Sequence, residues 1–127
     1  MAKIVILGAG ISGHVAAAHL RRKLDKTNEV VVVSPNSNYQ WIPSNIWVGI
    51  GRMKSKEILF PLAPLYKKKG IGFKQAKVVT FHPEGDSTEA KPYILAEYVV
   101  GENKGKLEKV TYDYLINATG PKLNFEG

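Results

Sequence analysis

Short apolar runs alternate with a segment of helical spacing in the first third of the chain. Residues 4–7 and 30–33 are continuously apolar, which is typical of strands buried on both faces of a parallel sheet, and we expect the first strand over 3–7. Between them, residues 11–25 have the spacing of a helix whose apolar side consists of Ile11, Val15, Ala18 and Leu24. A strand–helix–strand unit is almost always right-handed and places both strands in one parallel sheet. The pattern therefore predicts an α/β fold.

The stretch after Ser34 is polar and aromatic. Residues 35–47 are rich in Asn, Ser and Pro and predict a long loop, which is uncommon in a compact domain unless it is functional. Tyr39, Trp41 and Trp47 in this loop either fold back onto the core or form a wall for a planar ring system. Prolines near the start of residues 61–69 then predict a short helix that ends at Gly70.

The remaining apolar runs predict strands. Short strands are expected over 71–73, 78–81, 93–100 and 107–112, which together form a β-meander inserted in the α/β domain. A polar stretch separates the second and third of them, and its carboxylates (Glu84, Asp86, Glu89) are expected to be solvated. Residues 114–117 predict another buried strand, and Asp113 before it is expected at a turn or an edge.

Glycines at three positions mark the most informative local motif. Gly8, Gly10 and Gly13 follow the first strand and open the first helix, which is the arrangement that holds the pyrophosphate of a dinucleotide. The first glycine permits a tight turn, the second lets the backbone approach phosphate, and the third lets the helix pack closely on the strand. The small residues 118–120 follow the last strand and should lie at the same edge of the sheet.

Composition narrows the class of protein. The 127 residues suffice for one domain, and no apolar run approaches the ~20 residues that cross a bilayer. The net charge of +7 comes without a nucleic-acid motif or interleaved aromatic residues, so we predict no nucleic-acid partner. The chain has no cysteine and therefore no thiol chemistry of its own, and no metal-ligand spacing predicts a metal site. His14 and His19 are interpreted as ordinary helix side chains and His82 as exposed.

Several motifs together resemble a known family. The pairing of GAGISG (8–13) with YDYLINATGP (112–121) is similar to flavoproteins with two dinucleotide-binding domains. The segments 41–51, 60–73 and 118–125 resemble sulfide:quinone oxidoreductases most closely. This resemblance implies a Rossmann-like FAD/NAD(P)-binding fold with a parallel sheet, FAD as cofactor, and sulfide and a quinone as small-molecule substrates.

The resemblance also implies roles for individual residues. The FAD pyrophosphate would be held by Gly8, Ala9, Gly10, Ile11, Ser12 and Gly13. Lys77 and Val78 would line the adenine, Pro43 would approach the flavin ring, and Ala118, Thr119 and Gly120 would close the site from below. Ser34, Pro35 and Asn36 stand where an acidic residue usually binds the ribose, which weakens the grip on ribose and disfavours a plain NAD site.

The family's redox cysteines are absent, so we assign no catalytic residue to this chain. Residues 1–127 are expected to be the N-terminal portion of an FAD-binding domain in a longer enzyme, inactive alone, with weak or absent FAD binding and some self-association. Membrane contact would be peripheral and made by later sequence, which suggests a location in the cytoplasm or at the inner membrane. The alternatives are a type II NADH dehydrogenase, a flavocytochrome-type sulfide dehydrogenase flavoprotein, and a non-catalytic dinucleotide-binding module.

Overall fold

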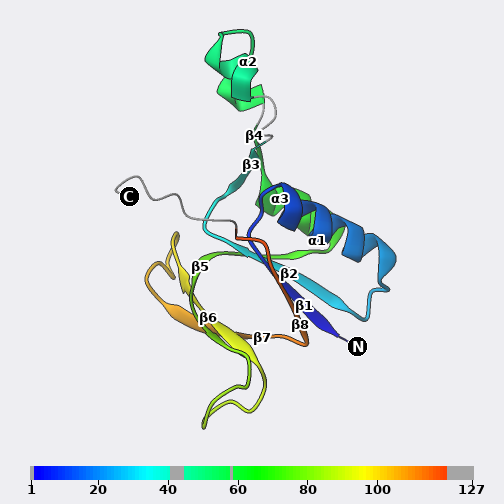
Figure 1. The fold of residues 1–127 in the computed structure, drawn as a ribbon, viewed down its shortest axis with the longest axis vertical. Helices are drawn as coiled ribbons and strands as arrows, with labels where there is room; N and C mark the ends of the chain where they lie inside the picture. Colours follow the sequence, from blue (N-terminus) through cyan, green and yellow to red (C-terminus); the bar gives the residue numbers. More distant parts are fainter. Residues whose placement is uncertain (1, 41–44, 58, 120–127) are drawn as a thin grey trace, which may run out of the picture.

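A single curved sheet of six strands forms the body of the molecule. The computed structural model describes residues 2–40, 45–57 and 59–119, and Figure 1 shows their arrangement. The strands lie in the order β7-β6-β5-β2-β1-β8. Helices α1 and α3 lie along one face of this sheet, as Figure 1 shows.

The parallel part of the sheet is built from the first strand–helix–strand unit. β1 (Lys3–Leu7) pairs in parallel with β2 (Glu29–Ser34) and with β8 (Tyr114–Asn117). Helix α1 (Ile11–Lys23) connects β1 to β2 and is two residues shorter than predicted, because Leu24 has extended backbone angles. The parallel α/β unit is therefore confirmed.

The antiparallel part of the sheet begins within one long strand. β5 (Gly72–His82) pairs in parallel with β2 through its first residues and then in antiparallel with β6 (Tyr93–Tyr98), which pairs with β7 (Leu107–Thr111). The prediction of two separate strands over 71–73 and 78–81 was wrong, because the polar residues Lys74, Gln75 and Lys77 between them continue the same ladder. The inserted β-meander is confirmed.

Two buried clusters cover the two faces of the sheet. One cluster lies under the helices and contains every second residue of the inner strands, such as Ile4 and Ile6 of β1. Ala17 of α1 and Leu62 of α3 (Leu62–Lys69) belong to the same cluster. The other contains Val5, Leu7, Val31, Val33, Ala76, Ile94, Ala96 and Val110. The meander therefore covers the sheet face that the helices leave open, which explains why residues 4–7 of β1 and 30–33 of β2 are apolar without alternation.

β8 differs from its prediction as a buried strand. Its residues are half-buried or exposed, and Tyr114 is 66% exposed. The reason is its position at the edge of the sheet, where it pairs only with β1 among the described strands. Asp113 lies at a bend just before this edge strand, as predicted, and its carboxylate accepts a hydrogen bond from the Lys3 N–H at 2.7 Å.

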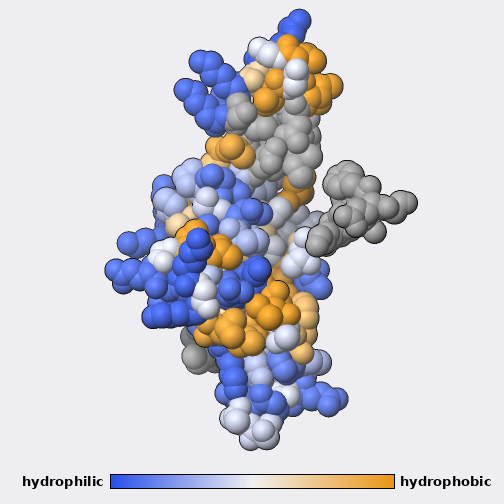
Figure 2. All heavy atoms as spheres, turned by 90° about the vertical axis from the view of Figure 1, so that its left-hand side faces the viewer, coloured by the Kyte–Doolittle hydropathy of each residue, from blue (hydrophilic) through white to orange (hydrophobic). Residues whose placement is uncertain are grey.

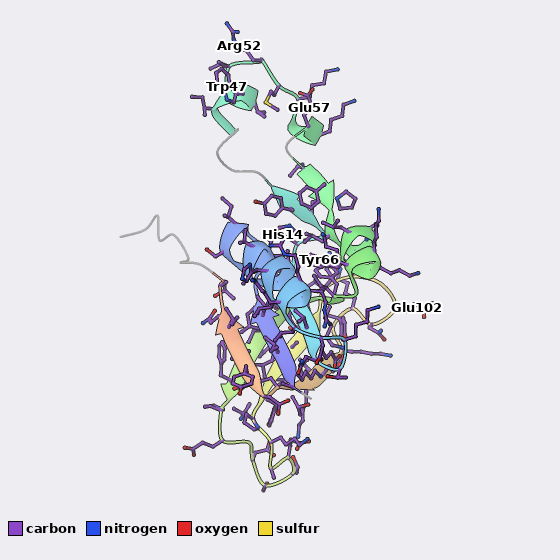
Figure 3. The ribbon with its side chains drawn as sticks, turned by 90° about the vertical axis from the view of Figure 1, so that its right-hand side faces the viewer. His14, Trp47, Arg52, Glu57, Tyr66 and Glu102 are labelled. Carbon is purple, nitrogen blue, oxygen red and sulfur yellow. The ribbon has the colours of Figure 1, made fainter. Side chains whose placement is uncertain are left out.

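An arm projects from the body between β2 and α3. It consists of the antiparallel strands β3 (Asn38–Gln40) and β4 (Leu59–Pro61), the helix α2 (Asn45–Gly49) and the 3-10 helix η2 (Ser55–Glu57). Figure 3 shows Trp47, Arg52 and Glu57 at its far end. Figure 2 shows hydrophobic residues gathered beside hydrophilic ones at this end. The segment predicted as a structureless loop thus contains regular elements.

The aromatic residues of the arm do not share one place. Tyr39 is buried in the cluster under the helices, as one of the two sequence interpretations expected, whereas Trp47 is 44% exposed on α2. Trp41 lies outside the described residues. Helix α3 has its predicted limits and ends at Gly70, whose φ of 76° is the left-handed conformation that a glycine accommodates.

Candidate cofactor-binding site

The glycine loop joins the carboxyl end of β1 to the start of α1. Gly8 has a φ of +96°, and a Cβ built on it would lie 2.4 Å from the Ala118 carbonyl oxygen. The Ala118 N–H donates a hydrogen bond to the Leu7 carbonyl at 2.8 Å. The loop and the segment after β8 therefore meet at one edge of the sheet, as the sequence predicted, and only a glycine at position 8 permits this approach.

Gly10 and Gly13 serve different purposes in the same loop. A Cβ on Gly13 would lie 2.0 Å from the Gly8 carbonyl oxygen, so the helix packs against the loop without room for a side chain. A Cβ on Gly10 would meet nothing within 4 Å, and the Gly10 backbone has extended angles that other residues also adopt. Protein packing therefore requires Gly13 but not Gly10. The open space at Gly10 is a cradle that a Cβ would partly fill.

The start of α1 favours an anion. No side chain caps this end of the helix, and its first turn contains no acidic residue. The first N–H groups of a helix have no partner within it, and the helix dipole places partial positive charge there. These N–H groups and the open space at Gly10 fit a pyrophosphate.

The end of β2 forms the next wall of the site. Ser34 is 1% exposed, and its Oγ accepts a hydrogen bond from the Asn36 N–H at 3.2 Å. The Gln75 side-chain amide donates to the Pro35 carbonyl at 3.3 Å, which ties this turn to β5. The Ser34 hydroxyl keeps its own proton for donation. A ribose at this wall would therefore meet neutral groups and no carboxylate.

These segments surround one cavity of about 620 Å³ at the carboxyl ends of β1 and β2, a size typical of small-molecule sites. Its lining residues are Gly8, Ala9, Gly10, Ile11, Ser12, Val33, Ser34, Pro35, Asn36, Ala76, Lys77, Val78, Phe81, Ala118 and Thr119. None of these is acidic, and Lys77 is the cation among them. The lining therefore suits a ligand with negative charge and apolar rings.

The cavity brings together nearly all the residues predicted for the cofactor. Every described residue of that set lines it except Gly13, which lies behind the loop and packs on Gly8. Pro43 and Gly120 lie outside the described residues. Sequence reasoning missed Val33, Ala76 and Phe81. Ala76 stands between the polar residues Gln75 and Lys77 of β5, so alternation could have indicated it, whereas the uniform run of valines in β2 does not single out Val33.

His14 lies on α1 behind the glycine loop, and its side chain is packed, in agreement with its interpretation as an ordinary helix side chain. Its Nδ1 is 2.8 Å from the Tyr66 hydroxyl, and its ring centroid is 4.7 Å from that of Tyr39 (Figure 3 shows His14 and Tyr66). Burial lowers the pKa of His14, with a further contribution from Lys69, and burial raises the pKa of Tyr66 to about 12. The pair joins α1 to α3 and to the base of the arm.

The acidic stretch between β5 and β6 is more ordered than expected. The Asp86 carboxylate accepts hydrogen bonds from the Tyr93 hydroxyl and from the N–H groups of Thr88 and Glu89. These bonds, that from Tyr93 foremost, lower the pKa of Asp86. Asp86 is exposed, as the sequence predicted, and its side chain in addition closes the turn. The described residues hold no cluster of three or more potential metal ligands.

The sequence matches a known family along almost its whole length. The family model described as pyridine nucleotide-disulphide oxidoreductase matches residues 2–127. The sulfide-quinone reductase of Aquifex aeolicus (strain VF5) is 32% identical over 126 residues, which cover 98% of this chain and 26% of that protein. The mitochondrial external alternative NAD(P)H-ubiquinone oxidoreductase B4 of Arabidopsis thaliana is 32% identical over 124 residues, which cover 96% of this chain and 20% of that protein.

A solved structure gives the same result for the fold. The X-ray structure of the sulfide:quinone oxidoreductase from Aquifex aeolicus matches with a TM-score of 0.81 and 27% identity, over 98% of this chain and 26% of that one. The predicted resemblance and Rossmann-like fold are thereby confirmed. The chain spans about a fifth to a quarter of the length of these relatives. No helix among its described residues has the length and apolar character to cross a membrane.

Proposed function

The chain belongs to the pyridine nucleotide-disulphide oxidoreductase family, and we propose that it forms the FAD-binding part of a sulfide:quinone oxidoreductase. Family membership makes it part of an oxidoreductase. The observation that carries FAD binding is one cavity that joins the glycine loop, the end of β2, the middle of β5 and the segment after β8, and the similarity to the sulfide-quinone reductase of Aquifex aeolicus supports the sulfide assignment. Such a cavity receives a dinucleotide lengthwise.

In this proposal each wall of the cavity binds a different part of the dinucleotide. The start of α1 holds the pyrophosphate, and Ser34 and Asn36 face the adenosine ribose. Lys77 and Val78 line the adenine, with Ala76 beside them. No lining residue at the end of β2 is a carboxylate, which disfavours a plain NAD site and leaves neutral groups to bind the ribose of FAD. Bound FAD supplies the redox chemistry, since it takes up two electrons and delivers them to an acceptor.

The chain's own contribution is binding and orientation. It contains no cysteine, so the sulfur chemistry of a sulfide oxidase is assigned to sequence beyond these residues. The same reasoning assigns the quinone pocket and any peripheral membrane contact to the complete protein. The chain is thus proposed as the N-terminal portion of a longer enzyme and as inactive alone.

A second candidate is a type II NADH:quinone oxidoreductase. The Arabidopsis thaliana NAD(P)H-ubiquinone oxidoreductase is 32% identical to this chain, as is the sulfide-quinone reductase of Aquifex aeolicus. Sequence identity therefore supports NADH and sulfide equally as the electron donor. The two candidates share the FAD cavity and differ in the electron donor.

The deciding experiment supplies the complete, flavin-loaded protein with a soluble quinone and either sulfide or NADH. Quinone reduction that depends on sulfide and needs no NADH supports the first proposal. Reduction with NADH alone selects the second candidate. A flavin-loaded protein that uses neither donor overturns both.

A further inference from the structure

Phe81 lines the cavity, although nothing in the sequence pattern marks it as a site residue. Phe81 is 49% exposed, so its ring is open to the cavity that it lines. It lies on β5, three residues beyond Val78, which also lines the cavity. An aromatic ring that is open to a ligand cavity offers a flat apolar surface to whatever binds there.

A β-bulge directs Phe81 to this face. The pairing of β5 with β6 shifts between Val78 and Thr80, because Val78 pairs with Ala96 and Thr80 with the next residue along, Leu95. Val79 is therefore an extra residue, and the alternation of side chains changes by one position after it. Without the bulge, Phe81 would face away from Ala76 and Val78.

The register beyond the bulge agrees with this. Phe81 pairs with Ile94, whose side chain belongs to the same buried cluster as Ala76. Paired residues on neighbouring strands point to the same face of a sheet. Ala76, Val78 and Phe81 therefore share one face of β5, and all three line the cavity.

Phe81 and the glycine loop lie on different strands that line the same cavity, so the base of a nucleotide could lie at Phe81 while its phosphates lie at the loop. Where β5 pairs with β2, over Gly72–Gln75, its axis lies two strand spacings, roughly 10 Å, from β1, and the strand then continues along the cavity through Ala76 and Val78 to Phe81. The phosphates belong at the start of α1, and the neutral wall at Ser34 lies between that point and β5. A base attached to a ribose at Ser34 would reach the face that carries Phe81.

We propose that the ring of Phe81 is a stacking platform for the adenine of the bound dinucleotide, and that the bulge at Val79 exists to aim it. The inference rests on the proposed function, because it assumes that the cavity holds FAD. Stacking on an aromatic side chain accepts any base, so Phe81 would add affinity for the adenylate half of FAD and none for its phosphates.

The test uses the complete protein with its flavin removed, and compares wild type with Phe81→Leu, Phe81→Tyr and Val79→Ala. FAD rebinding is titrated, and ADP and inorganic pyrophosphate are then used as competitors against FAD. Because each competitor must displace FAD, the competition experiment measures binding of ADP and pyrophosphate at the FAD site only. Val79→Ala is a matched control, since the bulge is a feature of the backbone pairing that alanine can keep, and the Val79 side chain is exposed and does not line the cavity.

We expect Phe81→Leu to weaken the binding of FAD and ADP by about tenfold and to leave competition by pyrophosphate unchanged. Phe81→Tyr and Val79→Ala should bind like wild type. Unchanged binding of FAD and ADP by Phe81→Leu would overturn the inference and leave the FAD proposal intact. Equal weakening of ADP and pyrophosphate would also overturn it, because it would indicate general distortion. A wild-type protein that binds no FAD would refute the proposed function itself.

A second variant covers the case in which Phe81→Leu does not fold. Phe81→Trp places a fluorescent indole at the same position, and its emission is the difference between the fluorescence of the variant and that of wild type. When ADP binds, stacking of adenine on this indole should quench that emission. An emission that ADP leaves unchanged would contradict the inference.

Discussion

Replacing Gly13 by alanine tests the packing that holds α1 against the glycine loop. The new Cβ would lie 2.0 Å from the Gly8 carbonyl oxygen, so the helix would have to retreat by about 1.4 Å to reach an ordinary contact of 3.4 Å. Overpacking of this kind costs about 3 kcal/mol. Alanine is favoured over glycine in a helix by about 1 kcal/mol, which leaves a net loss of about 2 kcal/mol.

The assay is thermal and urea unfolding followed by circular dichroism. A loss of about 2 kcal/mol should lower the melting temperature by roughly 8 °C in a domain of this size. Gly49→Ala is the matched control, because Gly49 is also helical and its Cβ would meet nothing within 4 Å. A Gly13→Ala protein as stable as wild type, or stabilised like the control, would refute the reasoning.

Three further predictions concern the pH dependence, the turn after β5 and the arm. Burial lowers the pKa of His14 below 6.5, so the unfolded state binds more protons. Its contribution to stability is therefore present above pH 6.5 and is lost as the pH falls through 6.5 toward the lowered pKa. Urea unfolding from about pH 5 to about pH 8 should show a shallower pH dependence for His14→Phe than for wild type, and parallel curves would contradict this. Asp86→Ala should speed amide hydrogen exchange across residues 84–91, because it removes the hydrogen bonds from Glu89 and Tyr93, whereas Glu84→Ala should not. Equal exchange rates in the two variants would contradict the role of Asp86 in this turn. Ile46→Lys together with Ile50→Lys should reduce self-association in sedimentation velocity, because both side chains are more than 60% exposed, and a wild-type monomer would disprove this.

The parts of the fold that were predicted correctly depend on local pattern. β1, α1 and β2 follow from apolar runs and helical spacing within a short stretch, and α3 follows from its flanking Pro61 and Gly70. The glycine loop was predictable because Gly8 and Gly13 stand at positions where the neighbouring backbone leaves no room for a side chain, and Gly10 stands between them at the motif's spacing.

The parts that were missed depend on contacts between distant residues. The orientation of Phe81 is set by a register shift against β6, which no pattern within β5 reveals. His14 and Tyr66 are 52 positions apart, so their hydrogen bond has no sequence signature. The Asp86 turn is the exception, because an Asp followed two residues later by Thr is a recognisable local signal.

The most direct test of the cofactor site is FAD binding by the flavin-free complete protein and by its Gly10→Ala variant. The added Cβ meets no protein atom within 4 Å and points into open space at the start of α1, so stability should change by no more than about 1 kcal/mol. The account predicts that wild type binds FAD and that Gly10→Ala binds it at least tenfold more weakly, because the methyl group occupies the place of the pyrophosphate. Equal FAD affinity of the two proteins, or no binding by wild type, would contradict it.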